Sequence, residues 1–155
     1  MQDLVIADSS CLIVLTNVEE LEILRRTYDR IFIPPQVAIE YKLSVPDWIT
    51  VESPSAESLH RFDRFDLGAG EIAAMALALD RPDAIVVLDD MDARTVAAQF
   101  GLKMTGTIGV LIAAKESHVI PAIKPIVRKI QSTNFRVSEA IIQSALRASG
   151  EMDDE

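Results

Sequence analysis

The sequence predicts an α/β domain with a mainly parallel β-sheet, because short apolar runs alternate with helical patterns along the chain. Two of the apolar runs, Leu4–Ala7 and Ile85–Leu88, are each followed directly by aspartate. Parallel strands end at the same edge of their sheet, and ligands of such folds bind there. The sequence therefore predicts an acidic site at the carboxyl edge of the sheet.

Strands are expected at five segments: Leu4–Ala7, Arg30–Ile33, Trp48–Val51, Ile85–Leu88 and Leu102–Met104. One helix is expected from Pro35, because proline is tolerated in a first helical turn. The remaining helices are expected at about Ser9, at Gly70–Leu79, and at Ala93–Phe100, Val110–Lys115, Ala122–Ile130 and Ser138–Ala148. We predict one domain over residues 1–148 and an acidic, disordered tail over residues 149–155.

Composition excludes several classes of protein. The chain has 155 residues, of which 49% are hydrophobic, so it is long enough to bury a core. Its net charge of -9 argues against a protein that coats nucleic acid by bulk electrostatics, although not against an enzyme that cuts it at an acidic site. No apolar stretch is long enough to span a membrane. The single cysteine, Cys11, fits a reducing cytoplasm and a role as a small core residue.

Four acidic positions are the candidate site. Asp8 has the strongest individual signal, because a carboxylate after a buried strand is costly unless it is paired, hydrogen-bonded or metal-bound. It also suits a helix cap, and the two roles are compatible. Either Asp89 or Asp90 is expected to face Asp8, with Asp90 preferred. Glu71 is also explained by a favourable contact with a helix dipole, and Glu40 by a solvated helix face.

An acidic cluster with few neighbouring cations favours a divalent metal ion. Oxygen ligands alone favour Mg²⁺ or Mn²⁺ over zinc, and such ions activate water for phosphodiester hydrolysis. Ser10 and Thr107 are candidates to bind a metal-bound water or a phosphate oxygen. Arg94 is a candidate contact to a substrate backbone, with a solvated arginine as the alternative.

The residues that carry this pattern resemble those of PIN-domain proteins, and in particular VapC-type ribonuclease toxins of toxin–antitoxin pairs. The resemblance covers the chain to about Ala148. Its segments are Ile6-Ala7-Asp8-Ser9-Ser10, Ile33-Pro34-Pro35-Gln36-Val37 with Glu40, Leu67-Gly68-Ala69-Gly70-Glu71, Leu88-Asp89-Asp90 with Ala93-Arg94, and Lys103 to Gly109.

The resemblance implies a three-layer α/β/α sandwich with five parallel strands in the order 3-2-1-4-5. It implies an Mg²⁺- or Mn²⁺-dependent ribonuclease whose catalytic residues are Asp8, Glu40, Glu71 and Asp90. The metal ligands would come from Asp8, Asp90, Glu71 and Asp89. The implied partners are an RNA substrate, a small antitoxin protein and a second copy of the chain, with no membrane. Many relatives have aspartate where this chain has Glu71.

Three alternative classes fit less well. A non-catalytic PIN-like module that binds RNA or protein has no need for a repulsive acidic cluster. A receiver-like phosphoacceptor domain needs an acidic pair near the first strand, whereas serines follow Asp8 here. A haloacid-dehalogenase-type enzyme needs a second aspartate at the position that Ser10 occupies.

Overall fold

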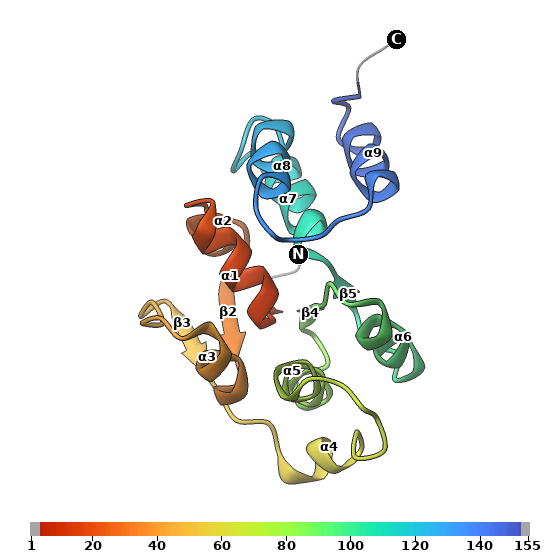
Figure 1. Ribbon diagram of the computed structural model, residues 1–155. Coiled ribbons are helices and arrows are strands. Elements are labelled where there is room, and N and C mark those ends of the chain that lie inside the picture. Colours follow the sequence, from red (N-terminus) through yellow and green to blue (C-terminus); the bar gives the residue numbers. More distant parts are fainter. Residues whose placement is uncertain (1–3, 153–155) are drawn as a thin grey trace.

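The computed structural model describes residues 4–152, which form a five-stranded sheet (Figure 1). The strands are β1 (Leu4–Ile6), β2 (Arg30–Ile33), β3 (Ile49–Val51), β4 (Ile85–Val87) and β5 (Met104–Thr105). Every neighbouring pair is parallel, and the order is β3-β2-β1-β4-β5, which confirms the expected order. The chain's winding reverses between β1 and β4, so these two strands flank the topological switch point.

Helices cover both faces of the sheet, which makes the fold the expected three-layer α/β/α sandwich (Figure 1). One face packs against α1 (Ser9–Asn17), α2 (Glu22–Thr27), α3 (Pro35–Tyr41), α7 (Thr107–Glu116), α8 (Lys124–Gln131) and α9 (Glu139–Ala148). The other face packs against α4 (Ala56–His60), α5 (Ala69–Asp80) and α6 (Met91–Gln99).

The central strand β1 supplies side chains to both hydrophobic cores. Val5 belongs to the first core, whereas Leu4 and Ile6 belong to the second, as the alternation of side chains along a strand requires. Because helices cover both faces, the strand reads as an unbroken apolar run in the sequence. The first carboxylate after this run, Asp8, is thereby fixed at the carboxyl edge of the sheet.

Some elements differ from the sequence-based expectation. Strand β5 spans Met104–Thr105 rather than Leu102–Met104, and neither α2 nor α4 was expected. Helix α2 has no side-chain hydrogen bond at its start, and it is stabilised by the burial of Ile23 and Leu24. Helices this short depend on tertiary packing, so the local sequence gives little sign of them. No helix within residues 4–152 is both long enough and apolar enough to cross a membrane.

The carboxyl-terminal end of the domain also differs from the expected boundary. Glu151 falls within the predicted tail, yet its carboxylate accepts a hydrogen bond from Lys115 Nζ at 2.9 Å. It also accepts hydrogen bonds from the backbone N–H groups of Ile123 and Lys124, at 2.7 and 2.9 Å. Burial raises the pKa of Glu151, but these bonds outweigh it and lower the pKa to about 2. Glu151 therefore packs with the domain, whereas residues 153–155 lie outside the described part.

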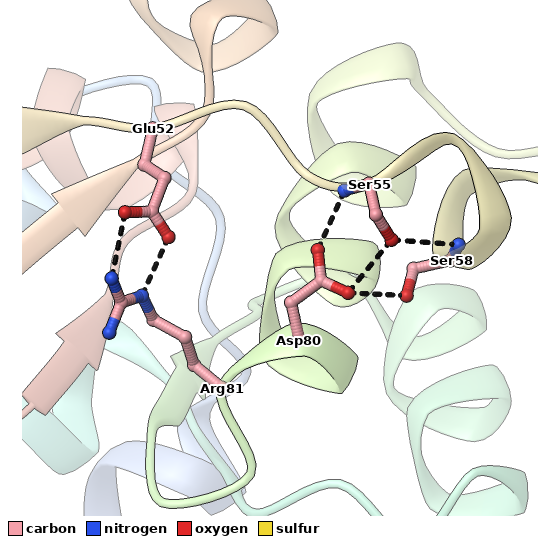
Figure 2. Close-up of polar contacts among 5 residues, drawn as sticks. All are labelled: Glu52, Ser55, Ser58, Asp80 and Arg81. Atoms are coloured by element: carbon pink, nitrogen blue, oxygen red, sulfur yellow. Dashed lines mark hydrogen bonds and ion pairs between the residues drawn. The ribbon is translucent and has the colours of Figure 1, made fainter.

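Two residues at the carboxyl end of α5, Asp80 and Arg81, bind the segment that runs from the end of β3 into α4 (Figure 2). Arg81 donates two hydrogen bonds to Glu52, at 2.6 and 2.7 Å. Asp80 accepts hydrogen bonds from the backbone N–H and hydroxyl of Ser55, at 2.6 and 2.9 Å, and from the Ser58 hydroxyl at 2.7 Å. These contacts fix the position of α5, whose other end borders the acidic site.

Replacing Asp80 by asparagine tests this contact. The change keeps the shape of the side chain but replaces one acceptor oxygen by an NH₂ group, which cannot accept the hydrogen bonds from Ser55 and Ser58. We therefore expect the free energy of unfolding to fall by about 1 kcal/mol. Burial raises the pKa of Asp80, but its hydrogen bonds leave it lower than usual. The contribution is therefore present above the ordinary aspartate pKa and is lost as the pH falls through the lowered value.

Urea denaturation at neutral and acidic pH measures this difference. Asp63→Asn is the matched control, because the Asp63 side chain is 71% exposed. Equal stability of Asp80→Asn and the wild type at neutral pH would contradict a stabilising role.

Candidate functional site

Asp8 lies immediately beyond β1 and is only 3% exposed. Its Oδ1 accepts a hydrogen bond from the Cys11 N–H at 2.9 Å, which caps α1, and its Oδ2 lies 3.1 Å from Ser10 Oγ. Burial, and then the charge of Asp89, raises the pKa of Asp8 to about 7. Asp8 is therefore both the helix cap and the buried, energetically costly carboxylate that the sequence predicts.

Asp89 is the second carboxylate at this edge. Its Oδ1 accepts a hydrogen bond from the Thr107 N–H at 2.8 Å, and its Oδ2 accepts one from Thr107 Oγ1 at 2.6 Å. Thr107 is fully buried and is the first residue of α7. The amino terminus of a helix carries a partial positive charge, so the start of α7 attracts the Asp89 carboxylate and holds it at this position.

Ser10 joins the two carboxylates. Its Oγ donates to Asp89 Oδ2 at 2.9 Å and also lies 3.1 Å from Asp8 Oδ2. A hydroxyl group has one hydrogen, so the two carboxylates share the Ser10 hydrogen and neither is fully satisfied by it. The Ser10 hydrogen bond lowers the pKa of Asp8, but burial and the charge of Asp89 outweigh it. When Asp8 loses its proton, one more negative charge faces that of Asp89, and a divalent cation would neutralise the pair.

Glu40 extends the acidic site across to α5. Its Oε1 accepts a hydrogen bond from Ser9 Oγ at 2.8 Å, and its Oε2 accepts one from the Gly70 N–H at 3.2 Å. A Cβ atom on Gly70 would lie 2.2 Å from Glu40 Oε1, so a side chain there would displace the Glu40 carboxylate. Glu40 is thus held at the amino terminus of α5 rather than solvated on the surface of α3.

Glu71 lies in the first turn of α5, where its Oε1 accepts a hydrogen bond from the Gly68 N–H at 3.2 Å. Burial raises the pKa of Glu71. The Gly68 hydrogen bond opposes this rise, whereas the negative charges of Asp90, Glu40 and Asp92 add to it. Glu71, Glu40 and Asp90 therefore form one electrostatic group.

Asp90 is placed differently from the expectation that it faces Asp8. Its Oδ2 accepts a hydrogen bond from the Ala93 N–H at 3.0 Å and caps α6. A capping side chain points back toward its own helix, so the preceding residue, Asp89, contacts Ser10 and raises the pKa of Asp8 instead. Asp89 rather than Asp90 is therefore the neighbour of Asp8, whereas the choice of the residue that faces a metal ion stays a prediction. Asp90 remains close enough to raise the pKa of Glu71.

Arg94 lies at the margin of the site. Its Nη1 donates to the Leu88 carbonyl at 2.8 Å, which fixes the guanidinium beside the end of β4. A Cβ atom on Gly106 would lie 3.4 Å from this nitrogen and 3.1 Å from Asp89 Oδ1. Its expected contact with substrate remains a prediction.

Two residues that contact Glu40, Ser9 and Gly70, were not predicted to belong to the site. Ser9 belongs to the Asp8-Ser9-Ser10 run, but only the fold shows that it points to Glu40 while Ser10 points to Asp89. Gly70 contributes its backbone N–H, which no pattern of side chains reveals.

Two further observations bear on metal binding within residues 4–152. No lysine, arginine or histidine there forms an ion pair with an acidic residue of the site. No group of three or more acidic, histidine or cysteine side chains there converges closely enough to hold a metal ion jointly.

Comparison with known proteins agrees with the fold. A family model described as a PIN domain matches residues 4–151. The chain therefore belongs to the PIN-domain family, whose members typically are metal-dependent nucleases. No curated protein and no solved structure matches the chain.

The raised pKa of Asp8 predicts an unusual pH dependence of stability. In the folded protein Asp8 keeps its proton to about pH 7, whereas in the unfolded chain it loses the proton near the ordinary value of 3.8. The free energy of unfolding should therefore fall as the pH rises from about 4 to about 7 and then level off. Urea denaturation in EDTA measures this fall.

Asp8→Asn is the comparison variant, because asparagine does not titrate. It should lack this part of the pH dependence and be more stable than the wild type at about pH 8 without divalent cations. Identical pH profiles for the two proteins would show that Asp8 titrates normally.

Gly70→Ala tests the position of Glu40. Alanine has a higher helix propensity than glycine, but at Gly70, in the first turn of α5, its Cβ would displace the Glu40 carboxylate. We expect Gly70→Ala to lower the melting temperature of the wild type and to raise that of Glu40→Ala, in which the obstruction is absent. The same sign of change in both backgrounds would exclude the steric contact.

Proposed function

We propose that this PIN-domain protein is an Mg²⁺- or Mn²⁺-dependent endoribonuclease. The observation that carries the proposal is the Asp8–Ser10–Asp89 arrangement, in which two carboxylates share one hydroxyl hydrogen at the switch point of the sheet. The family match supports the nuclease assignment, because PIN domains usually bind divalent metals.

The donor atoms at this position suit Mg²⁺ or Mn²⁺. Mg²⁺ is usually held by one or two carboxylates, several water molecules and substrate phosphate oxygens. Asp8 and Asp89 supply two carboxylates, and the site offers no softer ligand, because the thiol of Cys11 is fully buried and burial raises its pKa. When bound, such an ion polarises a phosphoryl oxygen and makes water more acidic.

The protein's own residues then have separate roles. Ser10 and Thr107 keep the Asp8 and Asp89 carboxylates in place through their hydroxyl groups. Glu71, whose pKa is raised by burial, is a stronger base than an ordinary glutamate and is suited to accept the proton of the attacking water. Glu40 and Asp90 contribute the negative charge that helps to keep that pKa high. Hydrolysis would leave a 5′-phosphate on one product.

The resemblance to VapC-type proteins suggests a cytoplasmic toxin that a small antitoxin protein inhibits. It also suggests a homodimer. Two exposed apolar side chains of the chain, Ile39 on α3 (74% exposed) and Leu43 just beyond it (58%), support an association surface of this kind.

A non-catalytic PIN-like module that binds RNA or protein is the second candidate. Four acidic residues of the site accept hydrogen bonds from the amino termini of helices: Asp8 at α1, Glu40 at α5, Asp90 at α6 and Asp89 at α7. These contacts stabilise negative charge without a cation. A purely structural acidic cluster is thus physically consistent.

RNA cleavage by the purified protein distinguishes the two candidates. We expect cleavage with Mg²⁺ or Mn²⁺ and loss of cleavage in EDTA. The cleavage rate of Asp8→Asn should fall at least about a hundredfold, because the change removes a carboxylate that would bind the metal ion. Gel analysis of labelled RNA fragments and of their 5′ ends is the measurement.

Asp63→Asn is the matched control, because it removes the same charge from an exposed position outside the site and should cleave normally. Full activity of a folded Asp8→Asn variant would exclude the proposed centre. No cleavage by the wild type, freed of any bound inhibitor, would favour the binding module.

A further inference from the structure

A hollow of about 700 Å³ adjoins the acidic site at Asp89. Ile108 and Ile112 of α7 and Ile141 of α9 contribute apolar side chains to its wall, together with Phe135 from the connection between α8 and α9. Ile141 is 52% exposed, so the hollow opens to solvent with an apolar lining.

A second hollow, of about 540 Å³, approaches the same site at Ser10. Phe135 lines this hollow too, together with Ile13 and Asn134. Ser10 and Asp89 are hydrogen-bonded to each other, so the two hollows meet the acidic site at adjacent side chains. Figure 1 shows the α8–α9 connection crossing near the start of α7 on its way to α9.

The position of Phe135 is set by a local turn. The Phe135 N–H donates to Thr133 Oγ1 at 3.1 Å, and the Thr133 hydroxyl donates to the Ile130 carbonyl at 2.6 Å. The ring is half-buried between the two hollows. An aromatic ring that is held in place beside an apolar hollow is a suitable stacking surface for a nucleobase.

The charged groups of the larger hollow favour an anion. Its lining includes Arg94 and Arg136 but only one carboxylate, that of Asp89, although the whole chain carries a net charge of -9. Within residues 4–152 neither arginine forms an ion pair. Two guanidinium groups beside an aromatic ring match the phosphate and base of a nucleotide, whereas an apolar peptide would use only the hydrophobic wall.

We propose that the larger hollow binds a nucleotide of single-stranded RNA next to the phosphate to be cleaved. Its base stacks on Phe135, and its backbone phosphate contacts Arg136 with Arg94 nearby. This inference rests on the proposed nuclease function and makes Phe135 and Arg136 determinants of substrate binding. Double-stranded RNA should bind less well, because its stacked bases are not free to enter the hollow.

Binding measured without cleavage tests the inference. Fluorescence anisotropy with a labelled, short single-stranded oligouridylate gives the Kd in EDTA, where hydrolysis does not occur. We expect Phe135→Leu, which removes the ring but keeps an apolar side chain, and Arg136→Gln each to raise the Kd about tenfold. Arg147→Gln removes the same charge from an exposed residue of α9 and should leave the Kd unchanged.

The outcomes separate this inference from the nuclease proposal. Wild-type binding that weakens in Phe135→Leu and Arg136→Gln supports the nucleotide site even if no RNA is cleaved. Cleavage by the wild type with an unchanged Kd in both variants overturns the inference and favours an apolar peptide as the ligand of the hollow. Failure of the wild type to bind the probe, or equal affinity for a duplex of the same length, also overturns it. Arg136 is exposed, so Arg136→Gln remains informative if Phe135→Leu lowers the melting temperature too far for the binding assay.

Discussion

The burial of a carboxylate at the end of the central strand determines how the surrounding helices are placed. Asp8 follows a strand that is covered on both faces, and it lies beside Asp89, so that two acidic groups occupy a poorly solvated edge. Such groups are costly unless donors surround them. The fold supplies those donors from the first turns of helices and from the hydroxyl groups of Ser10 and Thr107.

The strand order makes this arrangement possible. Pairing β1 directly with β4 brings Asp8 and Asp89 together although the sequence separates them widely, and the two strands lead into α1 and α6. Helices that follow parallel strands begin at the same edge, so their amino termini point toward the acids. The same geometry that stabilises the cluster without a cation also leaves its proton exchangeable near neutral pH.

The sequence contains the signals for the sheet and for most of the acidic positions. An apolar run that ends in aspartate predicts both a buried strand and a carboxylate at its edge, which is why Asp8 was accessible, whereas the strand order was implied by the resemblance to PIN-domain proteins. The choice between Asp89 and Asp90 depends on where α6 begins, and helix boundaries are the least certain part of such predictions. The segment around Phe135 was not identified because its position depends on how α8 and α9 pack together.

Polar contacts between distant segments also escaped prediction. Ser9 and Gly70 acquire their roles only when α1, α3 and α5 meet at Glu40. Similarly, an acidic composition near the carboxyl end suggested disorder, whereas Glu151 finds Lys115 and two backbone N–H groups on the folded domain. Composition records the charge of a segment but not the donors that tertiary structure brings to it.

The contacts of Glu151 have a consequence for the order in which the chain is completed during synthesis. Ile123 and Lys124, at the start of α8, receive their carboxylate partner from a residue near the end of the chain. A nascent polypeptide can pair its strands early but cannot complete this part of the domain until residue 151 has left the ribosome. Final consolidation of the layer formed by α7, α8 and α9 therefore waits for residue 151, even if the sheet assembles earlier.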